Sequence, residues 1–213
     1  MELFVTKNSP YARLIRALLH ELCINDRVIV TLAKTRAENS PYYAVNPSGR
    51  VPYLVRDDGI GIEDSDLIGK FLCALCDSDL WAFPNGDEGW ELRRLHSLCR
   101  SYLDGLSVWL REVARPVDAQ YATLIAHEQA RARRLTILWE QEIMSPLMQG
   151  PLNRTQMTLF CALEIEQLLP GFDWRTGHPN LSAWYERQSL RPSFSKTAKG
   201  RCCQTNANSS QFA

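Results

Sequence analysis

The stretch that decides the fold is residues 46–55, which read NPSGRVPYLV. Its first four residues favour a turn, and an apolar, strand-like run follows from Val51. A proline inside such a run is poorly tolerated unless it begins an edge strand or follows a cis peptide bond. Two interpretations are therefore open: an edge strand begins at Pro52, or a cis bond turns the Val51 N–H and C=O outward, where they can pair with an extended, peptide-like ligand.

The patterns on either side of this stretch predict a small α/β domain over residues 1–77. Before it, apolar spacing predicts a strand, a helix and a second strand, at Leu3–Thr6, Pro10–Cys23 and Arg27–Leu32. After it, Asp57-Asp58-Gly59 predicts a hairpin turn to a strand at Ile60–Ile62, and Asp64-Ser65 then begins a helix. The order β-α-β, irregular, β-β-α is that of a thioredoxin-like domain.

The remainder of the chain predicts a linker, an all-helical domain and a polar tail. Residues 78–88 form the linker, because Pro84-Asn85-Gly86 is a turn signal. Residues 89–198 form the helical domain, because apolar positions recur there every three or four residues. The predicted helices are a first long one ending before Pro116, a second over about Asp118–Ile143, and two more over Thr155–Leu169 and Leu181–Leu190. Residues 199–213 are polar, and we predict a disordered tail there.

Composition limits the classes of function that the chain can have. Its 213 residues hold 24 Lys+Arg and 24 Asp+Glu, so it is not a broadly basic nucleic-acid binder. No apolar run of about 18 residues is present, and we expect neither a membrane partner nor a secretory signal. Seven cysteines, mostly in apolar helical patterns, favour free buried thiols and a cytoplasmic protein. Cys73 and Cys76 lack a second ligand pair, so we expect no metal.

Ser9 stands where the first strand passes into the first helix. A helix N-terminus offers free N–H groups and a partial positive charge, which favour an anion such as a thiolate. Ser9-Pro10-Tyr11-Ala12 holds no cysteine, so any thiol must come from outside. An unperturbed thiol has a pKa near ~8.5, and a hydroxyl donating to its sulfur would lower that pKa. The alternative is that Ser9 only caps the helix.

Asp64 and Ser65 stand at the start of the last helix of the α/β domain. A carboxylate and a hydroxyl at a helix N-terminus could hold the α-amino and α-carboxylate groups of an amino acid, with the helix dipole favouring the carboxylate. Here too the alternative is capping alone, for which both residue types are suited.

Together these motifs resemble the N-terminal domain of glutathione S-transferases. That family carries S-P-[FY]-x-R, N-P-x-G-[KR]-V-P-x-L and [ED]-S-x-x-I in this order, and the chain has matching blocks at residues 9–13, 46–54 and 64–68. Residues 111–116 resemble a bacterial branch of the family, and residues 178–184 and 191–194 match its usual ending. The resemblance covers about residues 1–198.

The resemblance implies roles for individual residues. Ser9 would hydrogen-bond the glutathione sulfur and stabilise its thiolate. Val51, before a cis-Pro52, would pair its backbone with the cysteinyl part, with Arg50 in the same binding set, and Asp64 and Ser65 would bind the γ-glutamyl end. A small electrophile would lie between the domains, with Tyr11, Tyr102, Leu106 and Trp109 as candidate contacts. An aromatic stripe at helical spacing is otherwise core. The family is usually homodimeric.

We therefore expect a glutathione transferase that conjugates glutathione to a small hydrophobic electrophile, with glutathione as cosubstrate and detoxification as its role. Two alternatives remain: a non-catalytic interaction or stress-response protein that keeps the fold, and a glutathione-dependent reductase or lyase. One departure concerns stability. Family members carry a capping box of Ser or Thr followed three residues later by Asp, and Thr155-Gln156-Met157-Thr158 would place Thr158 where Asp stands.

Overall fold

The computed structural model describes residues 1–198, which divide into an N-terminal unit and a helical unit. The N-terminal unit holds residues 1–81 together with the segment that begins at Arg191, and the helical unit holds residues 82–190. This division differs from the predicted one at the C-terminal end, because the last helix packs with the N-terminal unit. The predicted disordered tail at 199–213 lies outside the described residues.

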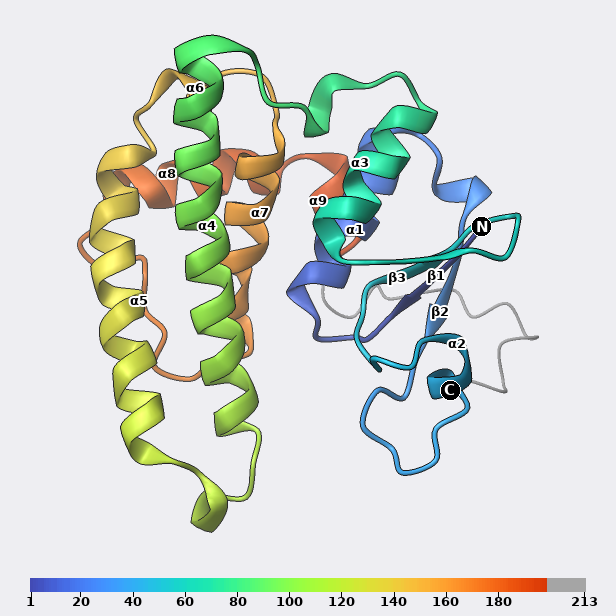
Figure 1. Cartoon of the computed structure of the whole chain (residues 1–213). Coiled ribbons are helices and arrows are strands. Elements are labelled where there is room, and N and C mark those ends of the chain that lie inside the picture. The colour runs from blue at the N-terminus through green and yellow to red at the C-terminus, as the bar shows by residue number, and fades with distance from the viewer. Residues whose placement is uncertain (199–213) are drawn as a thin grey trace. The chain divides into compact units, whose positions relative to one another are not determined.

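The N-terminal unit is built on a four-stranded mixed sheet (Figure 1). The strand order is β2-β1-β3-β4, with β1 parallel to β2 and antiparallel to β3, and β3 antiparallel to β4. The bounds are β1 Glu2–Val5, β2 Ile29–Leu32, β3 Tyr53–Val55 and β4 Gly61–Glu63. All four predicted strands are therefore present, and the predicted thioredoxin-like order is confirmed.

Helices cover both faces of this sheet. Successive side chains of a strand point to opposite faces, and Leu3, Phe4 and Val5 are all buried, so both faces of β1 must be covered. Phe4 packs against Tyr42 of α2, with ring centroids 5.3 Å apart. The α helices of the unit are α1 Pro10–Glu21, α2 Tyr42–Val45, α3 Ser65–Leu75 and α9 Pro192–Lys196. The sequence patterns did not predict α2.

The last helix, α9, is anchored to α1 within the N-terminal unit. The Arg191 guanidinium forms an ion pair with Glu21 at 2.9 Å. The buried Arg13 guanidinium donates to the Phe194 carbonyl at 2.9 Å and also to the Thr197 hydroxyl. These contacts explain why the chain returns to the first domain after the helical one.

The helical unit is a bundle in which α4 packs against α5 and α7 (Figure 1). Its helices are α4 Gly86–Val113, α5 Ala122–Glu142, α6 Pro146–Gln149, α7 Arg154–Leu163 and α8 Pro179–Ser189. The predicted linker thus ends earlier than expected, at the Asn85 cap. Four tryptophans are almost completely buried: Trp109, Trp139, Trp174 and Trp184. Aromatic side chains therefore dominate this core.

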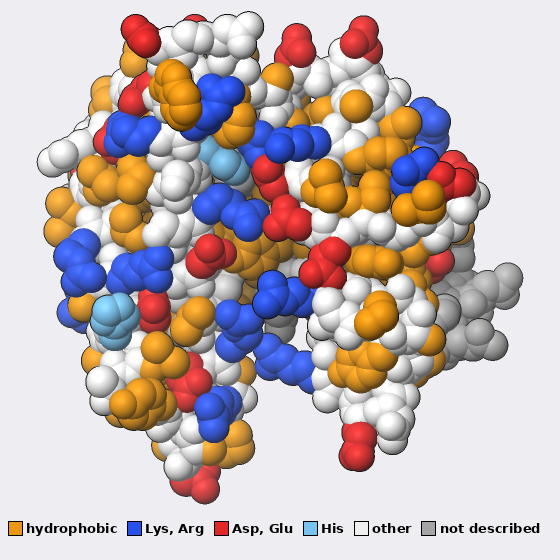
Figure 2. Space-filling model, in the orientation of Figure 1, with side chains coloured by type: hydrophobic (Ala, Val, Ile, Leu, Met, Phe, Trp, Pro, Cys, Tyr) orange, Lys and Arg blue, Asp and Glu red, His pale blue; other side chains and the backbone are white. Residues whose placement is uncertain are grey.

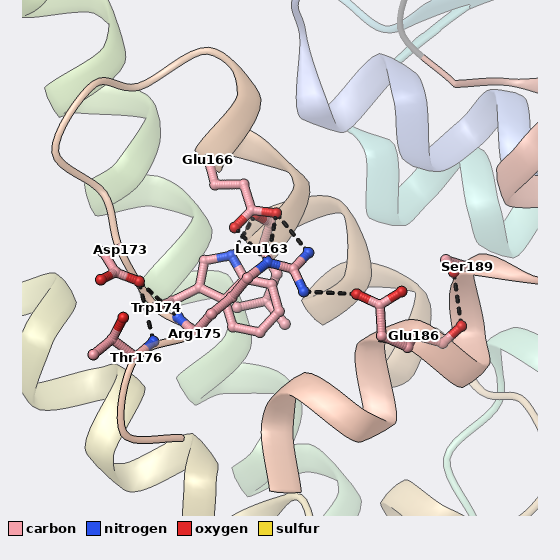
Figure 3. A network of polar contacts seen from close by, with 8 residues as sticks. All are labelled: Leu163, Glu166, Asp173, Trp174, Arg175, Thr176, Glu186 and Ser189. Carbon is pink, nitrogen blue, oxygen red and sulfur yellow. Dashed lines mark hydrogen bonds and ion pairs between the residues drawn. The ribbon is translucent and has the colours of Figure 1, made fainter. Parts of the chain in front are cut away.

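Polar contacts close the connection between α7 and α8. Arg175 donates from Nε and Nη2 to Glu166 and from Nη1 to Glu186, so its guanidinium bridges the two carboxylates (Figure 3). Its guanidinium also lies over the Trp174 ring, 4.3 Å from the centroid. The Asp173 carboxylate accepts the Arg175 N–H at 3.1 Å. These contacts hold Trp174 in the core. None of the predicted site residues takes part in them.

The cap of α7 differs from the predicted one. Asn153 is the N-cap, and its Oδ1 accepts the N–H groups of Thr155 and Gln156 at 3.0 and 3.1 Å. Thr158 instead donates its hydroxyl to the Arg154 carbonyl, one turn earlier. The capping box placed at Thr155 and Thr158 was therefore wrong. Asn is as good a cap as Ser or Asp, so α7 has an effective N-cap without Thr155.

Candidate functional site

The β-sheet brings the three predicted motifs to one of its ends. The register places Phe4 opposite Tyr53, and Tyr53 opposite Glu63, across three adjacent strands. β3 runs antiparallel to its two neighbours, so its N-terminal end lies beside the C-terminal ends of β1 and β4. Three segments therefore adjoin the same end of the sheet: the connection that contains Ser9, the Val51-Pro52 bond, and the Asp64-Ser65 turn.

Ser9 is the N-cap of α1. Its Oγ accepts the Ala12 N–H at 3.2 Å, and the fixed backbone of Pro10 begins the helix. A serine hydroxyl has one proton to donate besides its acceptor lone pairs, so capping does not consume its donor. The first turn of α1 holds no acidic side chain, so nothing there opposes the partial positive charge of the helix end. Capping and donation to a bound sulfur are therefore compatible in Ser9.

The Val51-Pro52 peptide bond is cis. This settles the choice left open by the sequence, because β3 begins at Tyr53 rather than as an edge strand at Pro52. Among the hydrogen bonds within residues 1–198, none uses the backbone N–H or C=O of Val51. These two groups can therefore accept an extended ligand in the manner of a strand partner.

The third motif begins α3, and its two residues differ in exposure. Asp64 is exposed and has a φ of 78°, in the left-handed region that disfavours most side chains. Its Oδ1 accepts the N–H groups of Asp66 and Leu67 at 2.7 and 3.2 Å, so Asp64 caps the helix. Ser65 is buried, with 3% of its surface exposed. Binding of an amino-acid group by this pair stays a prediction.

A polar network that the sequence analysis missed holds the segment before the cis bond. The Arg50 carbonyl accepts hydrogen bonds from Tyr42 Oη at 2.5 Å and from Asn46 Nδ2 at 3.0 Å. Burial raises the pKa of Tyr42 to about 12, so its hydroxyl remains a donor at neutral pH. The turn residues at 46–49 were the one feature of the sequence that could have indicated this network. The Arg50 side chain is exposed, and its ligand-binding role stays a prediction.

Gly49 is required by the turn within this network. Its φ is 67°, and a Cβ there would lie 2.8 Å from the Tyr43 ring. The Tyr43 hydroxyl in turn donates to the Thr35 carbonyl at 3.0 Å, which fixes the ring. Both the backbone conformation and the close approach therefore exclude a larger residue.

Of the four candidate electrophile contacts, one lies in the N-terminal unit, and the other three lie together on α4 of the helical unit. Tyr11 is half-buried in α1. Tyr102, Leu106 and Trp109 are each at most 2% exposed. Tyr102 hydrogen-bonds Thr136 at 2.6 Å, and the rings of Tyr102 and Trp109 meet Phe172 edge-on. This packing favours a core role for these three residues, and their contact with an electrophile stays a prediction.

Free thiols are a further candidate for chemistry among the described residues. In the part of the chain that the structure describes, Cys23, Cys73, Cys76, Cys99 and Cys161 are free, and no group of three His, Cys, Asp or Glu could hold a metal ion. Burial raises the pKa of Cys73 to about 11, so its thiol is protonated at neutral pH.

None of the helices within residues 1–198 is both long and apolar enough to cross a membrane. Acidic and basic side chains are interspersed on the face shown in Figure 2.

Comparison with known proteins shows a similarity to glutathione S-transferases. Residues 8–75 match the family model for the glutathione S-transferase N-terminal domain. The chain is 25% identical over 201 residues to an uncharacterized GST-like protein, YibF, of Escherichia coli K12, covering 92% of this chain and 98% of the relative.

Solved structures agree along nearly the whole chain. A glutathione transferase family member from Pseudomonas fluorescens Pf-5, with bound glutathione, is 28% identical with a TM-score of 0.80, covering 92% of this chain and 97% of that one. Gtt2 of Saccharomyces cerevisiae has the same TM-score at 21% identity, covering 93% and 100%, and supports the fold. These comparisons support the resemblance of the chain to the glutathione S-transferase superfamily, and the predicted fold class is confirmed.

Proposed function

We propose that this protein is a glutathione transferase that activates the thiol of glutathione for conjugation to a small hydrophobic electrophile. The observation that carries the proposal is the arrangement at one end of the sheet, where Ser9, Val51 and Asp64 adjoin the ends of three neighbouring strands. The relative from P. fluorescens, at 28% identity, was solved with glutathione bound. Glutathione is a tripeptide, and its chemical groups match what these three segments offer.

Each segment would bind one part of glutathione. The Val51 N–H and C=O would pair with the cysteinyl residue, as a strand pairs with its neighbour. Ser65 and Asp64, at the start of α3, would bind the γ-glutamyl carboxylate and amino group. Ser9 would donate its hydroxyl proton to the cysteinyl sulfur. A hydrogen bond to the charged form of a group lowers its pKa, so Ser9 would raise the fraction of thiolate at neutral pH.

The reaction needs little further chemistry. The thiolate sulfur forms a bond to an electrophilic carbon of the second substrate, and the leaving group departs with its electron pair or, in an addition, a neighbouring carbon accepts the pair and then a proton. The thiol proton has already passed to solvent. Holding the two reactants together supplies the remaining acceleration. A homodimer in the cytoplasm, with a role in detoxification, completes the proposal.

Ser9 separates this proposal from the reductase alternative. Thiol–disulfide exchange on this tetrad would need a cysteine, and Ser9 and Ala12 occupy the two positions. A protein with Ser9 can stabilise a thiolate but cannot form a mixed disulfide with it through this residue.

Calorimetric titration of glutathione, followed by mass spectrometry of reactions with a panel of aryl halides and enones, tests the proposal. We expect saturable binding at one site per chain and a conjugate whose formation exceeds the uncatalysed rate. Absence of glutathione binding would contradict the proposal and favour an interaction protein that keeps the fold. Binding without any conjugate across the panel would show a module that recognises glutathione but does not transfer it.

A further inference from the structure

Asn46 has every hydrogen-bonding group of its side chain engaged. Its Oδ1 accepts the Ser48 N–H at 3.1 Å, and its Nδ2 donates to the Arg50 carbonyl and to Glu63 Oε2, each at 3.0 Å. A side-chain amide has two N–H donors, so both are used by these two acceptors. Asn46 is 3% exposed, so its side-chain amide is largely shielded from water.

Glu63 accepts one of the two hydrogen bonds that Asn46 Nδ2 donates. It is the last residue of β4, immediately before the strained Asp64 that caps α3. Its carboxylate also accepts a hydrogen bond from the Ser48 hydroxyl. That bond, supported by Asn46 and by the charge of Arg50 and opposed by slight burial, holds the pKa of Glu63 below its usual value. The carboxylate is therefore ionised at neutral pH and remains a strong acceptor.

The Asn46 amide thus joins two segments that are separate in sequence. One bond fixes the carbonyl of Arg50, which precedes the Val51 peptide, and the other fixes Glu63, which precedes Asp64 and Ser65. We infer that Asn46 and Glu63 are positioning residues that couple the cysteinyl and γ-glutamyl subsites of the glutathione site. This inference rests on the proposed function for the identity of the ligand, but the coupling itself is a property of the unliganded fold.

Coupling and a purely local role of Glu63 predict different effects on ligand binding. Glu63 adjoins the γ-glutamyl subsite, so a purely local Glu63 would affect only ligands that carry a γ-glutamyl group. A coupled Glu63 also holds Asn46, and through it the peptide that receives the cysteinyl residue. Loss of the Glu63 carboxylate should therefore weaken a ligand that never reaches Asp64 or Ser65. Cysteinylglycine, which is glutathione without its γ-glutamyl residue, is such a ligand.

The test compares Glu63→Met, Glu63→Gln and the matched control Glu38→Gln. Glu38 is an exposed carboxylate in the preceding loop, and its substitution should change nothing. We expect Glu63→Met to weaken cysteinylglycine binding about tenfold, which lies within the usual range of coupling between two sites. Glu63→Gln should restore most of the affinity, because its amide oxygen still accepts from Asn46. A merely structural role would not be rescued in this way, and unchanged cysteinylglycine binding in Glu63→Met would overturn the inference.

A measurement without ligand separates this inference from the proposed function. In NMR spectra of the unliganded protein, Glu63→Met should shift the backbone amide signal of Val51, and Asn46→Ala should shift that of Ser65. Shifts confined to the substituted segment would contradict coupling even if glutathione binds. If the wild type binds no glutathione, the proposed function fails, while reciprocal shifts would still support the coupling.

Discussion

The N-terminal unit and the helical unit use their polar and aromatic side chains in different ways. In the N-terminal unit, the side chains of Ser9, Asn46 and Asp64 hydrogen-bond backbone groups and fix the connections at one end of the sheet. In the helical unit, the most buried large side chains are tryptophans that fill the core. A motif made of turn and cap residues therefore specifies the backbone geometry of the connections, whereas an aromatic stripe specifies packing. Substitutions in the two units should accordingly affect different properties.

The largest effect on stability should come from the helical core. Trp184 is fully buried, and its Nε1 donates to the Met148 carbonyl at 2.9 Å. We expect Trp184→Ala to lower the free energy of unfolding by about 3–5 kcal/mol, through the cavity and the lost hydrogen bond. Denaturant unfolding monitored by circular dichroism measures this. Trp90→Ala, at a position 71% exposed, is the control and should change little. A substantial loss of glutathione affinity in folded Trp184→Ala would contradict the claim that the aromatic core of the helical unit serves packing alone.

A smaller loss should follow removal of the anchor between α1 and α9 in the N-terminal unit. Arg13→Met removes the bonds to Phe194 and Thr197 and leaves a buried carbonyl without its donor. Hydrogen bonds to charged groups contribute roughly 1.5–3 kcal/mol, so we expect a loss of about 2–3 kcal/mol in thermal or denaturant unfolding. Arg36→Met, at an exposed arginine, serves as the control. Equal stability of the two variants would show that the return of the chain to this unit does not depend on Arg13.

The cap of α7 should contribute less again. Asn153→Ala removes the acceptor of two backbone N–H groups, and we expect a loss of about 1 kcal/mol in unfolding free energy. Asn85, the N-cap of α4, makes no side-chain cap bond, so Asn85→Ala is a matched control that should cost less. A larger loss in Asn85→Ala than in Asn153→Ala would contradict the assignment of the caps.

The smallest effect should be a pH dependence at the α1–α9 contact. Burial tends to raise the pKa of Glu21, but hydrogen bonds from Arg191 and Ser193 outweigh it and hold the pKa below its usual value of 4.5. A lowered pKa in the folded state stabilises the fold above pH 4.5, and this contribution is lost as the pH falls through the lowered pKa. The stability difference between wild type and Glu21→Gln should therefore be present at pH 7 and shrink below pH 4.5. A difference that is constant with pH would show that the Glu21 charge contributes nothing.

The features that sequence predicted are those encoded within a few residues. The cis bond was one of two interpretations of a proline in an apolar run, and the cap roles of Ser9 and Asp64 follow from residue type and position. Glu63 was missed because its contact with Asn46 joins residues 17 apart and exists only once β3 and β4 pair. The placement of α9 was missed for the same reason, since Arg13 and Phe194 are 181 residues apart.

Periodicity alone could not separate core from pocket in the helical unit. Tyr102, Leu106 and Trp109 recur at the spacing of a helix face, and either role needs an apolar face. Their burial and their ring contacts with Phe172 distinguish the roles only in the folded unit. The cap of α7 shows a related limit, because Asn153 and Thr155 are both accepted cap residues and the modest preference for Asn does not by itself fix where the helix begins.

The central claim is that the Ser9 hydroxyl, at the start of α1, stabilises the thiolate of bound glutathione. The most direct test follows the ultraviolet absorbance of the thiolate against pH for glutathione bound to the wild type and to Ser9→Ala. We predict that the bound thiol has a pKa below the ~8.5 of a free thiol in the wild type and close to that value in Ser9→Ala, with glutathione bound to both. An unshifted pKa in the wild type, or an equally lowered pKa in Ser9→Ala, would contradict the claim.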